Sequence, residues 1–394
     1  MNILIIIGSF YPATYYGGPV FSTLYTGREL ARLGHNVYVA STNANGPENL
    51  DVETDRFISL GENLHVKYYG GATPAGFSWR LLLNIWKDIK KADVVFLQSV
   101  FSSHVPVSLF YAALLGKPVV LSPRGSLSAW TIAKSRAGLK RLWLRTLITP
   151  FSAKKLAWHA TSDEERAAIL RNFARANVYI APNGIDFSEY EKPETLSSGE
   201  YMAKFAGVKS NAGLKIVSMG RLHQKKGFDI LVRAFSAIRK DFPGSVLLIA
   251  GPDGGERANL ERLINECGLE NFVFLTGEIS GADKVAFLAN ADLFVLPSHD
   301  ENFGNVYLES LAAGTPIIAS TNTPWAGVEA NGCGLCVPNT VEGTAGAMRR
   351  LLEQDLDEMG RAGRAWARET FSWTAIANKL TGIFERVAAG AANG

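Results

Sequence analysis

Two glutamates with seven residues between them, Glu301 and Glu309, bracket a polar stretch that could bind a phosphorylated ligand. The stretch follows an apolar run, residues 291–297, and leads into a short helical pattern that Gly314 and Pro316 end. We therefore expect Glu301 in a loop and Glu309 about one turn into a helix. Unpaired amides and the positive dipole end at a helix start favour a phosphate. The residues around that start are Asn302, Phe303, Gly304 and Asn305.

These groups together fit a nucleotide sugar. The helix start would hold the diphosphate, and Gly304 would let the ligand approach the backbone closely. One glutamate would accept hydrogen bonds from sugar hydroxyls and the other from a ribose diol, because carboxylates accept two such bonds readily. The competing interpretation is an ordinary strand-to-helix loop with two solvated acids, which short motif matches often turn out to be.

Cations that could stabilise a leaving diphosphate follow an expected strand at residues 215–219. Arg221 can bind phosphate oxygens in bidentate fashion, and Lys226 supplies a point charge. Two cations and a helix start could replace a divalent metal in stabilising the developing charge. The competing interpretation is that Arg221 and Lys226 are ordinary surface cations that follow a strand. The Asp-x-Asp match at 355–357 falls in a polar helix, so we expect no metal and no cofactor besides the nucleotide-sugar substrate.

The first half of the chain offers further candidates. Arg124 follows an expected strand, and we expect it to face the sugar or an acceptor phosphate. Gly17 and Gly18 precede a helical pattern. They fit either a tight turn into the helix or a place where the backbone closely approaches a phosphate or sugar. The Gly-x-Gly-x-x-Gly motif of dinucleotide-binding proteins is absent. We interpret His104 as a loop or core histidine. Weaker candidates are Asn183, Gly184 and the turn from Gly251 to Gly255.

Strand and helix patterns alternate twice along the chain, which predicts an α/β fold with two Rossmann-like, doubly wound parallel sheets. A length of 394 residues also suits two domains. We expect the two sheets to face across a cleft, since ligands of such sheets bind beyond the strand ends. The expected segments are a first domain at 1–188, a linker at 189–212, a second domain at 213–365 and a helical tail at 366–394.

Composition excludes several classes of protein. A net charge of +3 does not indicate a nucleic-acid binder, and three cysteines do not form a disulfide framework. The apolar run at the N-terminus is too short for a signal peptide. Residues 94–116 lack charge but contain several polar side chains, so they do not predict a membrane span. We expect a cytoplasmic protein, with a peripheral place on the inner face of the membrane as a further option.

A basic segment from Trp130 to Trp158 interleaves cations with Trp, Leu and Ile, and no acidic residue occurs from 94 to 162. This basic amphipathic pattern fits a surface that meets anionic lipid or a lipid-phosphate acceptor. It equally fits a solvated basic helix packed on the domain. Its cations are Lys134, Arg136, Lys140, Arg141, Arg145, Lys154 and Lys155.

These motifs in combination resemble the retaining glycosyltransferases of family 4, which have the GT-B fold. The resemblance covers nearly the whole chain. It is carried by Gly17-Gly18, residues 182–186, Gly220-Arg221 with Lys226-Gly227, and the two glutamates at 301 and 309.

The resemblance implies that the last helix crosses back to the first domain and that transfer retains the anomeric configuration without a metal. It also implies that Glu301 contacts donor-sugar hydroxyls and Glu309 the ribose. Arg221 and Lys226 would hold the diphosphate, Gly18 would close over it, and the backbone near Ile279 would contact the base.

Many relatives carry a histidine where Arg124 stands, so a phosphate-binding role fits this position better than a general base. We expect front-face attack, with the leaving phosphate taking the acceptor proton. The expected donor is a UDP-sugar rather than a GDP-sugar, and the acceptor a glycan or lipid-linked sugar of a bacterial-type surface polysaccharide. The alternatives are a GT-B epimerase or phosphorylase, and a non-catalytic subunit that binds a nucleotide sugar.

Overall fold

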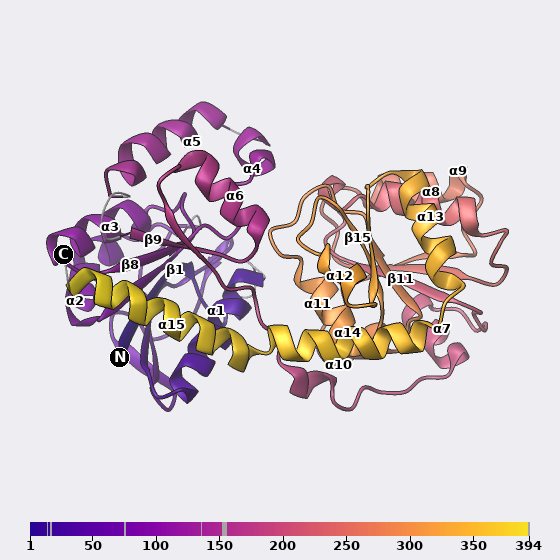
Figure 1. Cartoon of the computed structure of the whole chain (residues 1–394), viewed down its shortest axis with the longest axis horizontal. Helices are drawn as coiled ribbons and strands as arrows, with labels where there is room; N and C mark the ends of the chain where they lie inside the picture. Colours follow the sequence, from indigo (N-terminus) through magenta and orange to yellow (C-terminus); the bar gives the residue numbers. More distant parts are fainter. Residues whose placement is uncertain (14, 16–17, 75, 135, 152–155, 393–394) are drawn as a thin grey trace. The chain divides into compact units, whose positions relative to one another are not determined.

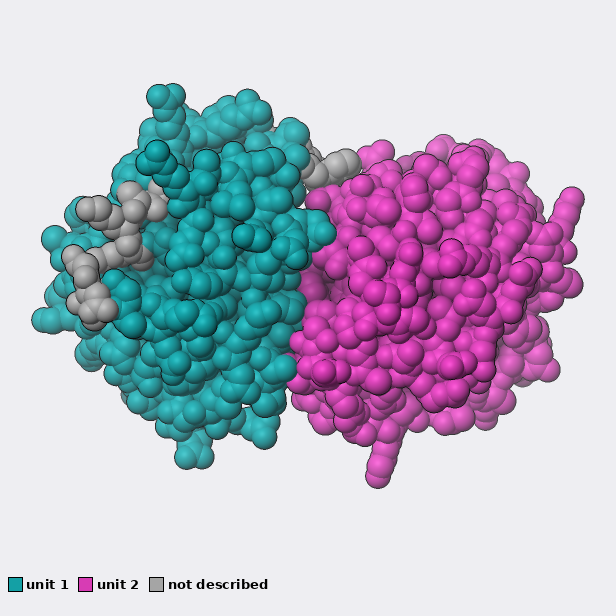
Figure 2. All heavy atoms as spheres, viewed as in Figure 1, with its two compact units in different colours: residues 1–184, 373–394 teal, residues 185–372 magenta. Residues whose placement is uncertain are grey.

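The computed structural model describes residues 1–13, 15, 18–74, 76–134, 136–151 and 156–392. It divides into two compact units (Figure 2). Unit 1 consists of Met1–Gly184 together with Trp373–Gly394, and unit 2 of Ile185–Ser372. Each unit has an α/β architecture around its own parallel sheet (Figure 1).

Unit 1 is built on an eight-stranded sheet in the order β10-β9-β8-β7-β1-β2-β6-β5. Its neighbouring strands pair in parallel except β5, which runs antiparallel to β6 at the edge. The central strands are nearly continuous apolar runs because helices cover both faces. The strands are β1 (Asn2–Ser9), β2 (Asn36–Thr42), β5 (Phe57–Gly61), β6 (Leu64–Tyr69), β7 (Val94–Gln98), β8 (Val119–Ser122), β9 (Leu156–Ala160) and β10 (Asn177–Ile180), with a small hairpin of β3 (Ala44–Asn45) and β4 (Glu48–Asn49).

The two faces of this sheet have separate hydrophobic cores. One core joins the sheet to α2 (Trp79–Lys91), α3 (His104–Leu114), α6 (Asp163–Asn172) and the π-helix η2 (Leu144–Ile148). The other joins it to α1 (Gly18–Arg32) and to the last helix, α15 (Trp373–Ala392). The remaining helical segments are α4 (Ala129–Lys134), α5 (Ala137–Trp143) and η3 (Thr149–Phe151).

Unit 2 has a six-stranded, wholly parallel sheet in the order β13-β12-β11-β14-β15-β16. Figure 1 shows α8, α9 and α13 on one side of the sheet and α10, α11 and α14 on the other. The strands are β11 (Lys215–Met219), β12 (Val246–Ala250), β13 (Val273–Gly277), β14 (Leu293–Leu296), β15 (Ile317–Ser320) and β16 (Gly334–Val337). The helices are η4 (Phe187–Tyr190), α7 (Ser198–Ala206), η5 (Gln224–Lys226), α8 (Phe228–Ile238), α9 (Arg257–Glu266), α10 (Gly281–Ala289), α11 (Asn305–Ala313), α12 (Gly327–Ala330), α13 (Val341–Leu352) and α14 (Leu356–Phe371).

The observed units differ in detail from the expected segments. Residues 189–212 belong to unit 2, where α7 buries Tyr201 and Met202 in the core. The C-terminal tail divides at Ser372 and Trp373, so α14 belongs to unit 2 and α15 to unit 1.

The basic segment from Trp130 to Trp158 is not one amphipathic surface. Trp158 is fully buried in β9, and Leu144 and Ile148 of η2 pack into the core of unit 1. The packing of Leu144 and Ile148 agrees with the alternative interpretation, a basic helix packed on the domain, and a lipid-facing role of the exposed cations stays a prediction. Residues 152–155, with Lys154 and Lys155, lie outside the described residues. Within the described part of the chain, no helix is both long and apolar enough to span a bilayer.

Candidate functional site

The topology of unit 2 predicts where a ligand would bind. The chain enters the sheet at β11, proceeds outward to β12 and β13, and returns to β14 on the other side of β11. The connections therefore diverge between β11 and β14. In open parallel sheets, ligands bind beyond the carboxyl ends of the strands at such a switch point. The loops that follow β11 and β14 contain Arg221, Lys226 and Glu301.

These two loops are joined by ion pairs. Lys226 Nζ lies 2.5 Å from Glu301 Oε1, and the two side chains are only 19% and 12% exposed. The Ser298 hydroxyl also donates to Glu301 Oε1, at 3.0 Å. One position earlier in each loop, Lys225 pairs with Asp300 at 2.9 Å. Together these contacts place a cation and a carboxylate side by side at the switch point.

Two glycines let the backbone segments of this edge approach closely. Gly227, which follows η5 with φ of 66°, lies so near β14 that a Cβ would stand 2.2 Å from the Pro297 carbonyl oxygen. Gly251 follows β12, and a Cβ there would stand 2.0 Å from the carbonyl oxygen of Gly220, which follows β11. No other residue type fits either position without displacement of the backbone. Gly251 thus shapes the edge of the site.

Helix α11 begins directly after this loop, as the sequence predicts. Gly304 precedes it in the left-handed region, with φ of 78°. Phe303 is buried and its carbonyl accepts a hydrogen bond from Trp325 Nε1 at 2.6 Å. Tyr307, in the first turn, donates its hydroxyl to the Leu296 carbonyl at 2.6 Å. These buried anchors fix the helix start at the carboxyl edge of the sheet.

Glu309 lies in α11 and pairs with Lys284 of α10, with Nζ and Oε1 2.9 Å apart. About a fifth of each of these two side chains is exposed, 20% for Glu309 and 23% for Lys284. Both glutamates of the sequence motif therefore meet a lysine from another element.

Arg221 has a different environment, because its side chain is exposed. Its aliphatic part lies along Gly254, where a Cβ would stand 2.7 Å from Arg221 Cγ. No described residue makes a hydrogen bond or ion pair with its guanidinium. The neighbouring Asp253 accepts hydrogen bonds from the amides of Gly255, Glu256 and Arg257 and thereby caps α9. Arg221 is thus a positioned cation that remains available to an anion.

Ile279 follows β13, the outermost strand on this side, and packs partly against the core of unit 2.

The structure adds two residues that the sequence analysis missed, Lys284 and Lys225. Lys225 stands beside Lys226 in the sequence, so its proximity to the second loop follows once β11 and β14 are known to be neighbours. Lys284 gives no such signal, because only the packing of α10 against α11 brings it to Glu309.

In unit 1, Arg124 belongs to a buried polar network at the carboxyl ends of β7 to β10. Its Nε donates to Gln98 Oε1 at 2.7 Å, and one terminal nitrogen donates to Asn183 Oδ1 at 2.8 Å. Burial lowers the pKa of Arg124 to about 10, which leaves it charged at neutral pH. Its φ of 53° places it in the left-handed region. The remaining terminal nitrogen has no acceptor among the described residues, and it could donate to an anion.

Two further buried groups complete this network. Glu165 accepts from the amides of Gly125 at 2.6 Å and Thr161 at 2.8 Å. His159 Nε2 lies 2.8 Å from the Ala181 carbonyl, so it carries the proton, and Nδ1 accepts from the Ser122 hydroxyl at 2.9 Å. Burial lowers the pKa of His159 to about 3, helped by the charge of Arg124. The histidine is therefore a neutral structural element.

Two other candidates of unit 1, Gly18 and His104, begin the helices that follow β1 and β7, the strands at the switch point of this sheet. Gly18 is the first residue of α1, whereas Gly17 lies outside the described residues. His104 begins α3 and is 1% exposed, and burial lowers its pKa to about 4. A core role for His104 agrees with this burial. Gly184 packs against Trp373, where a Cβ would stand 2.6 Å from the indole ring.

Other features of the surface do not join these sites. Asp355 caps α14 through the Glu358 amide, and among the described residues no group of three or more His, Cys, Asp or Glu could hold a metal ion.

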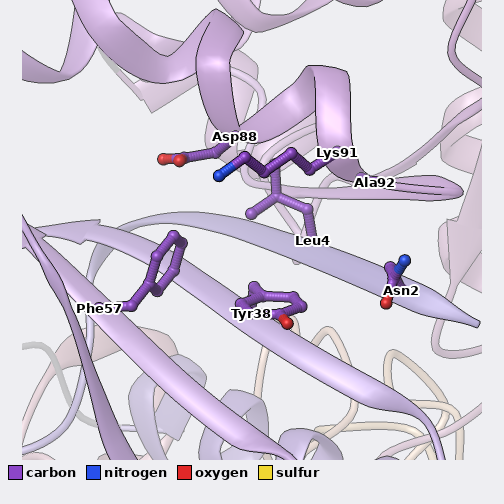
Figure 3. A pocket seen from close by; sticks show the side chains of 7 residues that line it. All are labelled: Asn2, Leu4, Tyr38, Phe57, Asp88, Lys91 and Ala92. Atoms are coloured by element: carbon purple, nitrogen blue, oxygen red, sulfur yellow. The ribbon is translucent and has the colours of Figure 1, made fainter.

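A cavity of about 280 Å³ lies between α2 and the sheet of unit 1 (Figure 3). Tyr38, Phe57, Asp88 and Lys91 line it, and it includes none of the predicted site residues.

Comparison with known proteins assigns both halves of the chain. The family described as "Glycosyltransferase Family 4" matches residues 16–189, and the family "Glycosyl transferases group 1" matches residues 203–366. Between them they cover most of the sequence. The chain belongs to the family 4 glycosyltransferases. The expected family is thereby confirmed, and with it the GT-B fold.

Individual relatives share the fold and differ in what they act on. A GDP-mannose-dependent alpha-(1-6)-phosphatidylinositol monomannoside mannosyltransferase of Mycobacterium tuberculosis is 32% identical over 218 residues, which are 52% of this chain and 55% of the relative. The chain thus spans about half the length of that relative. A glycogen synthase of the same species is 26% identical over 98% of the chain and 94% of its own length. Among solved structures, Anabaena HepE in complex with UDP superposes with a TM-score of 0.76 at 18% identity, over 98% of this chain and 100% of that one.

Proposed function

We propose that this protein transfers a sugar from a nucleoside diphosphate sugar to a glycan or lipid-linked acceptor in surface polysaccharide or glycolipid synthesis. The observation that carries the proposal is the contact of Lys226 with Glu301 at the switch point of unit 2, directly before the start of α11. A cation, a carboxylate and a helix start at the carboxyl edge of a parallel sheet form a site for a sugar attached to a diphosphate.

Each group has a role in binding the donor. Lys226, Arg221 and the amides at the start of α11 would bind the diphosphate, because all of these groups donate hydrogen bonds to anionic oxygens. Glu301 would accept hydrogen bonds from sugar hydroxyls. Glu309, paired with Lys284, would accept from the ribose diol. The backbone near Ile279 would contact the base.

The reaction we propose retains the anomeric configuration and needs no metal. The bond between the anomeric carbon and the diphosphate oxygen breaks while the acceptor oxygen bonds to the same face of that carbon. The leaving phosphate oxygen takes the acceptor proton. Arg221, Lys226 and the α11 start supply the fixed positive charge that the departing diphosphate requires. Arg124 would contact the sugar or an acceptor phosphate.

The base of the donor is tested by a direct comparison. The sequence favoured uridine, whereas a relative that is 32% identical is named as GDP-mannose-dependent. Thermal unfolding with UDP, GDP and their sugars, in the presence of a chelator, compares these donors without turnover. A ligand at about 100 times its dissociation constant stabilises the native state by about 2.7 kcal/mol, so the true donor nucleotide should stand out. No shift with any of them would overturn the proposal.

The cations are tested by substitution. Arg221→Ala combined with Lys226→Ala should weaken binding of the nucleoside diphosphate by about 3–6 kcal/mol, since hydrogen bonds to charged groups contribute about 1.5–3 kcal/mol each. Lys225→Ala is the matched control, because Lys225 is adjacent in sequence and pairs with Asp300 rather than Glu301. Calorimetric titration with and without added Mg²⁺ measures both the affinity and any dependence on the metal. Wild-type affinity in the double variant would contradict the assignment.

The proposal includes work at the cytoplasmic face of a membrane. The part of the basic segment that remains exposed includes Arg136, Arg141 and Arg145. Each cation near an anionic surface contributes about 1 kcal/mol. Binding to anionic vesicles should therefore weaken as the ionic strength rises. Binding that does not change with salt concentration would contradict a role for this segment.

A further inference from the structure

The cavity of about 280 Å³ in unit 1 lies at the edge of the sheet where strands β1 and β2 begin. Asn2 is the first residue of β1, and Lys91 is the last residue of α2, which ends above this edge. The network of Arg124 lies at the other edge, at the carboxyl ends of β7 to β10. A ligand in the cavity would therefore contact none of the residues that we assign to the donor.

The walls of the cavity are apolar and partly aromatic. Leu4 of β1, Tyr38 of β2 and Phe57 of β5 form the side that belongs to the sheet. The rings of Tyr38 and Phe57 meet edge to face, with their centroids 5.2 Å apart and their planes at 72°. On the side of the helix, Ala92 is too small to fill the space. Apolar and aromatic walls with a few polar groups are the usual lining of a small-molecule site.

The negative charge of Asp88, which also lines the cavity, is already bound within unit 1. Lys67 Nζ donates to one of its carboxylate oxygens and the Tyr69 hydroxyl to the other, each at 2.6 Å. The side chains of Asp88 and Lys67 are only 4% and 13% exposed, so little water screens the attraction between them. Asp88 therefore offers little attraction to a cationic ligand.

The positive charge of Lys91, by contrast, has no partner in the described part of the chain, neither an ion pair nor a hydrogen bond. Figure 3 shows its side chain lying over the cavity, opposite Tyr38 and Phe57, with the ammonium nitrogen on the side of Asp88. Asn2 adds a second donor. Its Oδ1 accepts from Asn36 Nδ2 at 3.1 Å, whereas its own Nδ2 has no acceptor among the described residues. The open polar groups of the lining thus include a cation and an amide donor.

We propose that this cavity binds a small organic anion with a flat apolar body, namely an aromatic carboxylate. The carboxylate accepts hydrogen bonds from Lys91 and Asn2 Nδ2, and the ring packs against Tyr38 and Phe57. A cation fits less well, because Lys91 would repel it and Asp88 is already paired. The volume is just below the about 300–1,000 Å³ that is typical of ligand pockets, so a single ring with a short substituent suits it. This inference goes beyond the proposed function, and no part of it depends on sugar transfer.

Calorimetric titration of the full chain with three probes tests the chemistry of the ligand. Benzoate should bind with a dissociation constant of about 1 mM or lower, which is within reach of a ligand of about nine non-hydrogen atoms. Benzamide has the same ring without the charge, and acetate has the charge without the ring. Each of these two should bind about tenfold more weakly than benzoate or worse.

A substitution tests the role of Lys91. Lys91→Gln should weaken the binding of benzoate about tenfold, because a hydrogen bond to a charged donor is lost. Lys90→Gln is the matched control, since Lys90 is the neighbouring exposed lysine of α2 and does not line the cavity. Both lysines lie on the surface, so both variants should fold, and thermal unfolding without ligand checks this.

The position of the ligand is tested with crystals soaked in 4-iodobenzoate, in which the anomalous signal of iodine locates the ring. We expect the iodine between α2 and the rings of Tyr38 and Phe57. A nucleoside diphosphate should not displace benzoate, because the cavity shares no residue with the donor site.

Four outcomes would overturn the inference. Benzoate could fail to bind, benzamide could bind as tightly as benzoate, or Lys91→Gln could bind benzoate as the wild type does. The iodine could also lie elsewhere, or UDP or GDP could displace benzoate, which would assign the anion to the donor site. None of these results depends on turnover, so they are distinguishable from failure of the proposed transferase activity.

Discussion

At the scale of single residues, the ion pair of Lys226 and Glu301 determines how a donor could bind. In the structure the two side chains bind each other, with Nζ and Oε1 2.5 Å apart. A diphosphate would compete for the lysine, and Glu301 would then accept from a sugar hydroxyl instead. The exchange replaces one charged contact by two, so the cost of opening the pair is offset by the ligand. On the proposed function, the sugar and the diphosphate would therefore bind cooperatively.

This coupling predicts the effect of Glu301→Gln. The amide keeps the shape but loses the charge, so turnover should fall about tenfold or more while the nucleoside diphosphate still binds. Steady-state rates and calorimetric affinities measured on one preparation separate the two effects. Asp300→Asn is the control, since Asp300 is adjacent and pairs with Lys225. Full turnover in Glu301→Gln would remove the role assigned to this carboxylate.

A pH dependence of stability follows from the two buried histidines of unit 1. Burial lowers the pKa of His159 to about 3 and that of His104 to about 4, from an unfolded value near 6.5. Above pH 6.5 both states are neutral and the stability is fully present. As pH falls below 6.5, only the unfolded state takes up the protons, so stability is lost. Each histidine contributes a slope of about 1.4 kcal/mol per pH unit.

Denaturant unfolding between pH 5 and pH 5.5 measures this slope, in the window where the unfolded chain binds close to one proton per histidine and the folded chain binds almost none. His159→Gln should reduce the slope by about 1.4 kcal/mol per pH unit, whatever its effect on stability itself. Equal slopes in the variant and the wild type would mean that His159 also ionises in the folded chain.

At the scale of elements, the carboxyl edge of the second sheet depends on backbone contacts that only glycine permits. Gly227 and Gly207 both follow helical turns, with φ of 66° and 70°. A Cβ at Gly227 would meet the Pro297 carbonyl oxygen at 2.2 Å, whereas a Cβ at Gly207 would have nothing within 4 Å. Alanine substitutions at these two glycines therefore separate two destabilising effects. Both variants carry the cost of a left-handed backbone, but only the one at Gly227 also meets the Pro297 carbonyl oxygen.

Gly207→Ala should therefore cost only about 1 kcal/mol of stability, the price of a left-handed alanine. Gly227→Ala should cost about 2–4 kcal/mol and should also weaken nucleotide binding, because the loops after β11 and β14 must move apart. Denaturant unfolding and calorimetry check both effects. Equal losses in the two variants would show that the contact with Pro297 is unimportant.

Much of this edge could be predicted from local sequence. Apolar runs gave the central strands, and Gly314 and Pro316 placed the end of α11 correctly because turn chemistry is local. The partners of the charged side chains could not be predicted. Lys284 meets Glu309 only through the packing of α10 on α11, and the edge strand β5 has too weak an alternation to be seen. Leu144 and Ile148 show the converse, since side chains that pack into the core of unit 1 also fitted an amphipathic surface pattern.

At the scale of the whole molecule, the end of the chain belongs to the first unit. Helix α15 packs on the face of the first sheet that α1 also covers. Phe384 is fully buried there, with its ring edge-to-face against Phe96 of β7 at 5.2 Å. Trp373 stacks on Tyr25 of α1 at 5.7 Å. Unit 1 therefore cannot complete its core until the last residues of the chain are present, whereas unit 2 is continuous in sequence.

This division predicts where a mutation at the C-terminus acts. Phe384→Ala should destabilise unit 1 by about 3–5 kcal/mol through the cavity it leaves. Hydrogen exchange should accelerate in β1, β7 and α1, some 280 residues or more before the mutation. Residues 185–372 should keep their protection and their stabilisation by nucleotide. Phe287→Ala, at a buried position in α10 of unit 2, should show the reverse pattern. Faster exchange throughout the chain in both variants would mean that the two units unfold as one cooperative body.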